Sequence, residues 1–309
     1  MGVFVFLPLV LPLTAWPIAR LAEHRLHPRT ATWLLTWTAV LLAVCSTLCL
    51  ALLMVVGTAQ LPGNPLPDGW SDPEVREAVP LDEVAGRAAI PALLAVLVSC
   101  LAAGWRHYRV RKQATRAVAG LSGRSVAVLP DQVPYAYALP GRQGGQVVVS
   151  TGMLAGLTPG ERRALFAHER AHLAGRHHRF LLGVQLAARA NPFLRPLWTA
   201  VAFTAERWAD EEAAARTGSR RTVALAVGKS ALVSRGAPVA SLAHFAAGPV
   251  PRRVAALLGP APVARNWVSV FTTLGLAMWT AAAGVTVSAL SSANSAVTLF
   301  FILHAALDA

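Results

Sequence analysis

Residues 33–56 read WLLTWTAVLLAVCSTLCLALLMVV and contain no charged side chain. About 20 mostly apolar residues are enough to cross the hydrocarbon core of a bilayer as a helix. This run therefore predicts a transmembrane helix, and it assigns the chain to the integral membrane proteins.

The composition of the whole chain agrees with this class. Of the 309 residues, 55% are hydrophobic and 14% are charged, and the mean hydropathy is +0.49. A soluble domain carries about 25% charged residues. These values exclude a disordered protein, a coiled coil and an ordinary cytosolic enzyme. Cys45, Cys49 and Cys100 all lie in apolar runs, which indicates small buried side chains rather than disulfides or metal ligands.

Three further apolar stretches are predicted to span the membrane: residues 2–19, 88–103 and 268–290. The first lacks a basic start and a cleavage site, so we expect an uncleaved span despite its three prolines. After the last come polar residues 291–295 and an apolar tail that is too short to span. We expect this tail at the interface or docked on other helices, with a fifth short span as the alternative.

The charges between the spans predict the orientation of the chain. Residues 58–87 hold two basic and six acidic side chains, whereas residues 106–266 hold 23 basic and seven acidic ones. Basic connections stay on the cytoplasmic side of a cell membrane. We therefore expect a multi-pass protein with residues 1–105 as three spans, 106–266 as a cytoplasmic domain, and 267–309 as the fourth span and tail.

The predicted domain begins with a basic stretch next to the third span: Arg106, Arg109, Arg111, Lys112 and Arg116. Such a stretch is typical of contact with anionic lipid headgroups. Direct binding of nucleic acid is not expected, because no fold signature of a DNA- or RNA-binding module accompanies the charge.

The rest of the domain is predicted to be α+β. Short β-type runs at residues 125–129, 135–139 and 146–150 are punctuated by proline and glycine, which predicts a small sheet with hairpin connections. Helices follow. Thr158 and Glu161 form a capping box at the start of one helix, Gly218 is predicted to end a later one, and Ser219 to cap the next.

The helix that starts after Thr158 contains the motif HExxH as His168, Glu169 and His172. Residues four apart lie on one helical face, so both imidazoles can reach one zinc ion. Glu169 can act on water at the metal as a general base without being a ligand.

A catalytic zinc site takes three protein ligands, and we expect the third from a later helix. Four of the seven acids lie together there: Glu206, Asp210, Glu211 and Glu212. Glu206 is the best candidate ligand, and Asp210, one turn further, can orient a ligand histidine. The alternative is a solvated acidic face.

Three histidines outside the motif have roles of other kinds. His244 is a candidate for stabilising the transition state, with a surface or structural role as the alternative. His177 and His178 are interpreted as residues at the end of the motif helix, where they suit the helix dipole.

The runs Tyr135-Ala-Tyr-Ala, Val147-Val-Val-Ser-Thr-Gly, HERAHLAGRHH from His168 and Glu206-Arg-Trp-Ala-Asp resemble the BlaR/MecR-type integral-membrane zinc metallopeptidases. These are similar to the HtpX and CAAX-prenyl peptidases, which share HExxH followed by ExxxD. The resemblance implies a zincin-like gluzincin site with one Zn²⁺ per chain, on His168, His172 and Glu206. It also implies that a strand pairs with extended substrate; its residues are Tyr135, Ala136, Tyr137, Ala138 and Leu139.

We therefore expect a zinc-dependent endopeptidase that cuts a regulatory protein, such as a transcriptional repressor, or a membrane-associated protein. The antibiotic-sensing relatives carry an extracellular penicillin-binding domain after the last span. This sequence ends soon after its fourth predicted span, so β-lactam sensing is not expected. The alternatives are a quality-control protease for membrane proteins and a zinc-binding receptor or scaffold that does not cleave.

Overall fold

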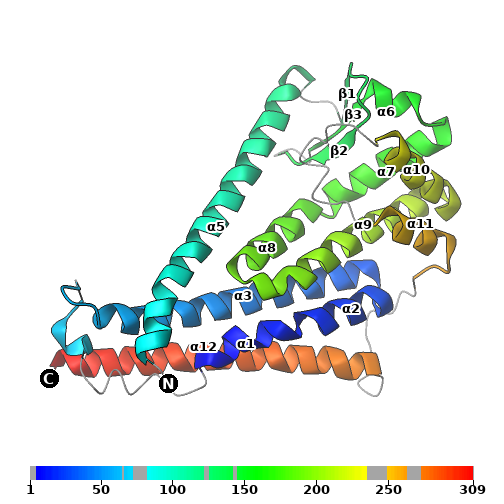
Figure 1. Ribbon diagram of the computed structural model, residues 1–309. Coiled ribbons are helices and arrows are strands. Elements are labelled where there is room, and N and C mark those ends of the chain that lie inside the picture. Colours follow the sequence, from blue (N-terminus) through cyan, green and yellow to red (C-terminus); the bar gives the residue numbers. More distant parts are fainter. Residues whose placement is uncertain are drawn as a thin grey trace.

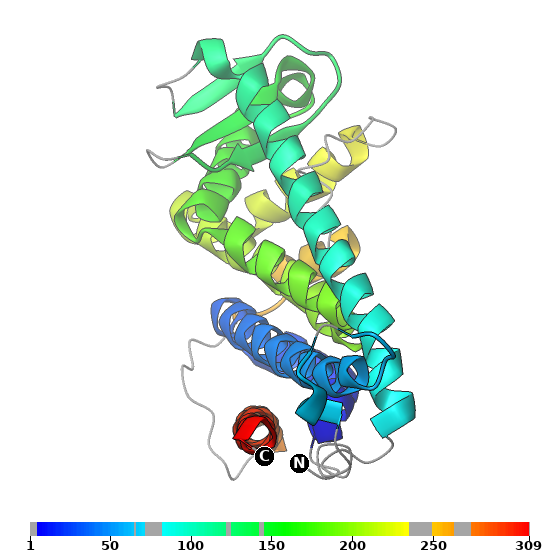
Figure 2. The same ribbon diagram turned by 90° about the vertical axis from the view of Figure 1, so that its left-hand side faces the viewer.

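The computed structural model describes residues 5–64, 66–71, 82–121, 125–141, 145–234, 249–262 and 273–308. Within them the chain is mostly helical, with one small sheet. Figures 1 and 2 show α12, α3, the pair α8 and α9, and then α7 with the sheet following one another through the molecule.

Three described helices are long and apolar enough to cross a membrane. They are α3 (Pro28–Ala59), α5 (Asp82–Ala117) and α12 (Thr273–Asp308). The backbones of α3 and α5 approach each other so closely at Gly57 and Gly86 that a Cβ atom on either glycine would collide with the other helix. The two glycines therefore set how closely these helices pack.

A fourth span is not confirmed. Of the predicted stretch 2–19, residues 2–4 lie outside the described residues, and the rest is divided among short elements. These elements are α1 (Leu7–Val10), η2 (Leu11–Thr14) and α2 (Ala15–Arg25). The physical reason is proline: Pro8 and Pro12 lack the N–H group that a continuous helix would use, and each sits at the start of a new short helix.

The tail expected after residue 290 packs on another helix, since Leu299 and Leu303 are buried in one cluster with Leu53 of α3, but it is not separate from the last span. Residues 291–308 continue α12, and Ser292 stays inside the helix because its hydroxyl donates to the Ser288 carbonyl at 2.9 Å and lies 3.4 Å from the Cys45 carbonyl of α3. Ser292 is polar, yet its hydroxyl finds acceptors within the helix and on the neighbouring helix. Residues 268–272 of the predicted span lie outside the described residues.

The three predicted strands are confirmed as β1 (Val126–Leu129), β2 (Ala136–Leu139) and β3 (Gln146–Ser150). The predicted hairpin connection is confirmed for β2 and β3, which pair antiparallel, and is wrong for β1, which pairs parallel with β3 and gives the strand order β1-β3-β2. β3 carries the fully buried valines at positions 147–149, and a strand in the centre of the sheet buries such side chains best. β2 is consequently an edge strand.

Helices make up the rest of this part. They are α6 (Thr151–Ala155), α7 (Pro159–Ala174), α8 (His177–Ala190), α9 (Arg195–Thr217), α10 (Arg220–Val233) and α11 (Val250–Leu258), with short turns η3 (Asp68–Ser71), η4 (Ala119–Leu121) and η5 (Pro192–Leu194). The predicted caps are confirmed. Thr158 and Glu161 form the capping box of α7, Gly218 ends α9 with a φ of 72°, and Ser219 accepts from the Thr222 amide to cap α10.

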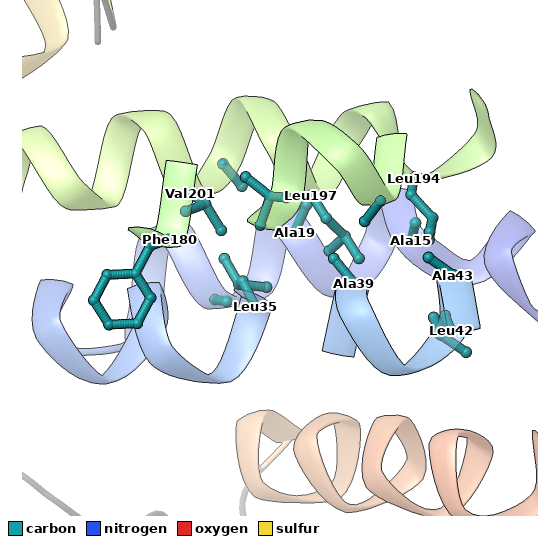
Figure 3. Packing of buried hydrophobic residues seen from close by; sticks show 14 of the residues in the cluster. Ala15, Ala19, Leu35, Ala39, Leu42, Ala43, Phe180, Leu194, Leu197 and Val201 are labelled. Carbon is teal, nitrogen blue, oxygen red and sulfur yellow. The ribbon is translucent and has the colours of Figure 1, made fainter. Parts of the chain in front are cut away.

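The largest described hydrophobic cluster joins α8 and α9 to the apolar helices (Figure 3). Leu194, Leu197 and Val201 are buried between α9 and the small and apolar side chains of α2 and α3, such as Ala39. Within the same interface the Thr32 hydroxyl donates to Thr204 at 3.0 Å. The N-terminal half of α9 is therefore fixed on a helix long enough to span, and its C-terminal half extends toward α7.

Candidate metal centre

The two histidines of HExxH meet the predicted acid of α9. The Nε2 atoms of His168 and His172 lie 3.0 Å apart, because the residues are one turn apart on α7. Glu206 places Oε2 3.4 Å from His168 Nε2 and Oε1 3.2 Å from His172 Nε2. One ligand atom from each of the three residues lies within 4.8 Å of the others.

This donor set fits a zinc ion. Two imidazole nitrogens face each other and a carboxylate, and the buried Glu206 Oε1 takes part in no hydrogen bond of normal geometry despite its short distance to His172. Two histidines and one carboxylate are a ligand set found in catalytic zinc sites. We conclude that His168, His172 and Glu206 are the residues that could hold a metal.

Asp210 lies beside His168, as its position one turn beyond Glu206 suggested. Its Oδ1 atom lies 3.0 Å from His168 Nδ1, on the side of the ring away from Nε2. A carboxylate at Nδ1 keeps the proton on that nitrogen and leaves the Nε2 lone pair for a metal. Asp210 is completely buried, so this contact is shielded from water.

Arg253 of α11 is a site residue that the sequence analysis missed. Its Nε and Nη2 atoms donate to both oxygens of Asp210, at 2.9 and 2.7 Å. Its Nη1 atom lies 2.7 Å from Oε2 of Glu206. One buried guanidinium thus compensates two buried carboxylates. The sequence offered one indication that Arg253 is buried. It lies four residues before Leu257, so the two share the inward face of a short helix.

The protonation states follow from these contacts. Burial alone would raise the pKa of Asp210 and of Glu206, but the Arg253 guanidinium outweighs it and lowers both, that of Glu206 well below its usual range. Burial alone would lower the pKa of His168, but the nearby carboxylates of Asp210 and Glu206 raise it to about 10. A metal ion must therefore displace a proton from His168 to bind.

His177 belongs to the site, contrary to the interpretation from sequence. It begins α8 instead of ending α7, and its Nδ1 atom lies 2.8 Å from Nδ1 of His172. Burial lowers the pKa of His177 to about 2, so it stays neutral and can accept the Nδ1 proton of His172. His177 thus stands to His172 as Asp210 stands to His168, since each contacts the Nδ1 atom of its histidine.

The chain reaches this position through a tight reversal between α7 and α8. Arg176 adopts a left-handed conformation with a φ of 52°. The His177 ring returns over Gly175, where a Cβ atom would collide with the ring. The ring also contacts Trp208 of α9, with the ring centroids 4.5 Å apart and the planes tilted by 48°. A histidine five residues after His172 therefore reaches it only because of this turn.

The remaining predicted residues lie as follows. Glu169 is buried beside His168, and no described group hydrogen-bonds its carboxylate. Ala136, Tyr137, Ala138 and Leu139 form edge strand β2, which contacts α7, and Tyr135 directly precedes it. His244 lies outside the described residues.

Residues 101–190 match the model of Peptidase family M48. The matched stretch contains His168, Glu169 and His172, covers less than a third of the chain, and ends before Glu206. A search of curated proteins and a search of solved structures gave no match. The match supports a metallopeptidase of this family, and the three apolar helices support a membrane protein. The closer resemblance to BlaR/MecR-type peptidases stays a prediction.

Proposed function

We propose that this protein is a membrane-embedded, zinc-dependent endopeptidase. The observation that carries the proposal is the meeting of three ligand atoms from His168, His172 and Glu206, within a chain whose residues 101–190 match a peptidase family. The uncommitted carboxylate of Glu169 beside this cluster favours an enzyme over a binding protein, because a structural zinc site has no use for a base.

Each site residue has a separate role in the proposed peptide hydrolysis. The chemistry that a bound zinc ion supplies is polarisation of the scissile carbonyl and a lower pKa of water. Glu169 takes a proton from the attacking water and gives it to the amine that leaves. Asp210 and His177 hold the two imidazoles by their Nδ1 atoms, so that both Nε2 atoms point toward the metal position.

The substrate is proposed to bind as an extended strand along β2. An edge strand presents unpaired backbone groups, and no described strand pairs with β2 on the side away from β3. Because β2 packs beside α7, a peptide added there would run close to the histidine helix. A regulatory protein or a membrane-associated protein is the proposed substrate class.

The protein is proposed to lie in the cell membrane with this part on the cytoplasmic side. The support is the charge asymmetry between residues 58–87 and 106–266. The end of α5 carries exposed arginines and lysine together with exposed Trp105 and Tyr108. Interfacial aromatic rings beside basic side chains favour contact with anionic lipid headgroups.

Glu169→Gln is the test of this function. The amide keeps the size of the side chain but cannot accept the proton, so cleavage of an unfolded protein substrate should fall at least about 100-fold. Elemental analysis should still find one zinc per chain. Glu212→Gln, which changes an acid that forms no ion pair with a described residue, is the matched control and should retain activity. Near-normal turnover by Glu169→Gln would refute the assigned base.

A further inference from the structure

A surface pocket of about 630 Å³ lies outside the metal centre, between the start of α7, the end of α9 and the start of α10. Arg163 and Arg170 of α7 and Arg216 of α9 line it, together with Phe166, Thr217 and Thr222. We call this site the arginine pocket. Its volume lies within the range of small-molecule binding sites.

The arginine pocket and the metal ligands occupy opposite faces of α7. Arg163, Phe166 and Arg170 are spaced by three and four residues, so they share one face of a helix with 3.6 residues per turn. His168 and His172 share another face, and the same spacing places the two faces about 180° apart. The pocket is therefore not an extension of the proposed active site.

The three guanidinium groups form no hydrogen bond or ion pair with any described residue, and all three side chains are exposed. This differs from the arginines nearby, since Arg207 and Arg220 both bind Glu211. Glu161, next to Gly160 of the pocket lining, already pairs with Lys229. Three like charges thus line one hollow with no described counterion.

The other groups that line the pocket indicate which kind of ligand it can bind. The Thr217 hydroxyl donates to the Ala213 carbonyl at 2.8 Å, and that of Thr222 donates to Ser219 at 2.9 Å. The arginines are therefore the available donors. A guanidinium offers a planar fork of N–H groups that matches phosphate oxygens, and three such groups favour a multiply charged anion. Phe166 adds an apolar wall for an uncharged part of the ligand.

We propose that the arginine pocket binds the phosphate groups of an organic phosphate ligand. The phosphates lie among Arg163, Arg170 and Arg216, and the organic part contacts Phe166. The ligand is either a soluble molecule, such as a nucleoside diphosphate, or the headgroup of an anionic lipid. The site holds independently of the proposed peptidase activity, because none of its residues contributes to the metal centre.

The test measures binding of ADP and of pyrophosphate to the detergent-purified full chain by calorimetry. We expect saturable binding that weakens at least about tenfold in Arg163→Gln/Arg170→Gln and in Arg216→Gln, since each removes charge-assisted hydrogen bonds. Arg221→Gln removes an exposed arginine of α10 outside the pocket and should bind as the unchanged protein does. Equal binding by all variants would overturn the proposal.

Three further comparisons distinguish a soluble phosphate from a lipid headgroup, an acidic peptide and an anion at the metal centre. If only phosphatidylglycerol vesicles bind less to Arg163→Gln/Arg170→Gln than to Arg221→Gln, the phosphate is that of a lipid headgroup. If hexaglutamate alone depends on the arginines, the phosphate assignment is wrong and an acidic peptide is the ligand. If pyrophosphate binding is lost in His168→Ala/His172→Ala and retained in the arginine variants, the anion binds at the metal centre and the pocket assignment fails.

Discussion

The two faces of α7 hold charged side chains in opposite ways. On one face, His168 and His172 lie in a buried cluster in which Glu206 and Asp210 are compensated by Arg253. On the other face, the arginines of the arginine pocket are exposed, alike in sign and unpaired among the described residues. The same helix thus carries one site whose charges have counterions within the protein and another whose charges have none among the described residues.

The difference lies in what each site needs from outside. A buried charge requires a partner, because burial without one costs several kcal/mol. The metal centre therefore contains both signs even without its ion. Exposed arginines are solvated by water, so the protein stays folded without a partner for them. They can consequently stay available for an anion. Changes in the two sites should differ strongly in their effect on stability.

The largest effect is expected from Arg253→Met. This change leaves the Asp210 and Glu206 carboxylates buried without their cation, which should lower the free energy of unfolding by about 3–5 kcal/mol. Chemical denaturation of metal-free protein measures it. Zinc should restore part of the loss, because the ion supplies positive charge to Glu206. Arg252→Gln is the neighbouring control, since Arg252 pairs with Glu23 while its side chain is 43% exposed; it should cost less than about 1 kcal/mol.

An unchanged denaturation midpoint in metal-free Arg253→Met would contradict the view that the cluster is held by internal compensation. It would indicate instead that Asp210 and Glu206 take up protons when the guanidinium is removed. A pH titration of the stability of the variant would distinguish this, because protonation of buried carboxyls would make the variant relatively more stable in acid.

A smaller effect is expected from His177→Phe. Phenylalanine keeps an aromatic ring on Trp208 but removes the hydrogen-bond partner of His172, so zinc affinity or activity should fall about 10- to 100-fold. Since His177 stays neutral at any ordinary pH, this loss should be the same at pH 6 and pH 9. His178→Phe, at the adjacent position, is the control. Equal zinc affinities of the two variants in a titration would show that His177 does not support the metal centre.

The smallest effect is expected from single Arg→Gln changes at positions 163, 170 and 216 without ligand. Each should change the free energy of unfolding by no more than about 0.5 kcal/mol. The direction should be stabilising at low salt, because a like charge is removed, and the difference should disappear as salt screens the charges. Thermal denaturation at two salt concentrations measures it. A marked loss of stability would mean that the arginines have internal partners.

Local signals in the sequence predicted local structure well. Thr158 and Glu161 predicted the start of α7, and Gly218 predicted the end of α9, because a cap depends on residues within one turn. The end predicted for the last apolar helix, at residue 290, was wrong, because α12 continues to Asp308. The polar residues 291–295 were expected to follow the end of the span, whereas Ser292 forms its hydrogen bonds within α12 and against α3. The sequence cannot show which polar side chains find a partner elsewhere in the fold.

The sequence by itself determined three long apolar helices, the three strands and the candidate residues His168, Glu169, His172 and Glu206, since these depend on runs, spacing and side-chain chemistry. Only the tertiary structure decided that β3 separates β1 from β2, and that His177 and Arg253 join the metal centre. The reason is distance along the chain. Arg253 lies 43 residues beyond Asp210, and no periodic pattern connects them. Their contact results from the packing of α11 against α9, which places one cation between two buried carboxylates.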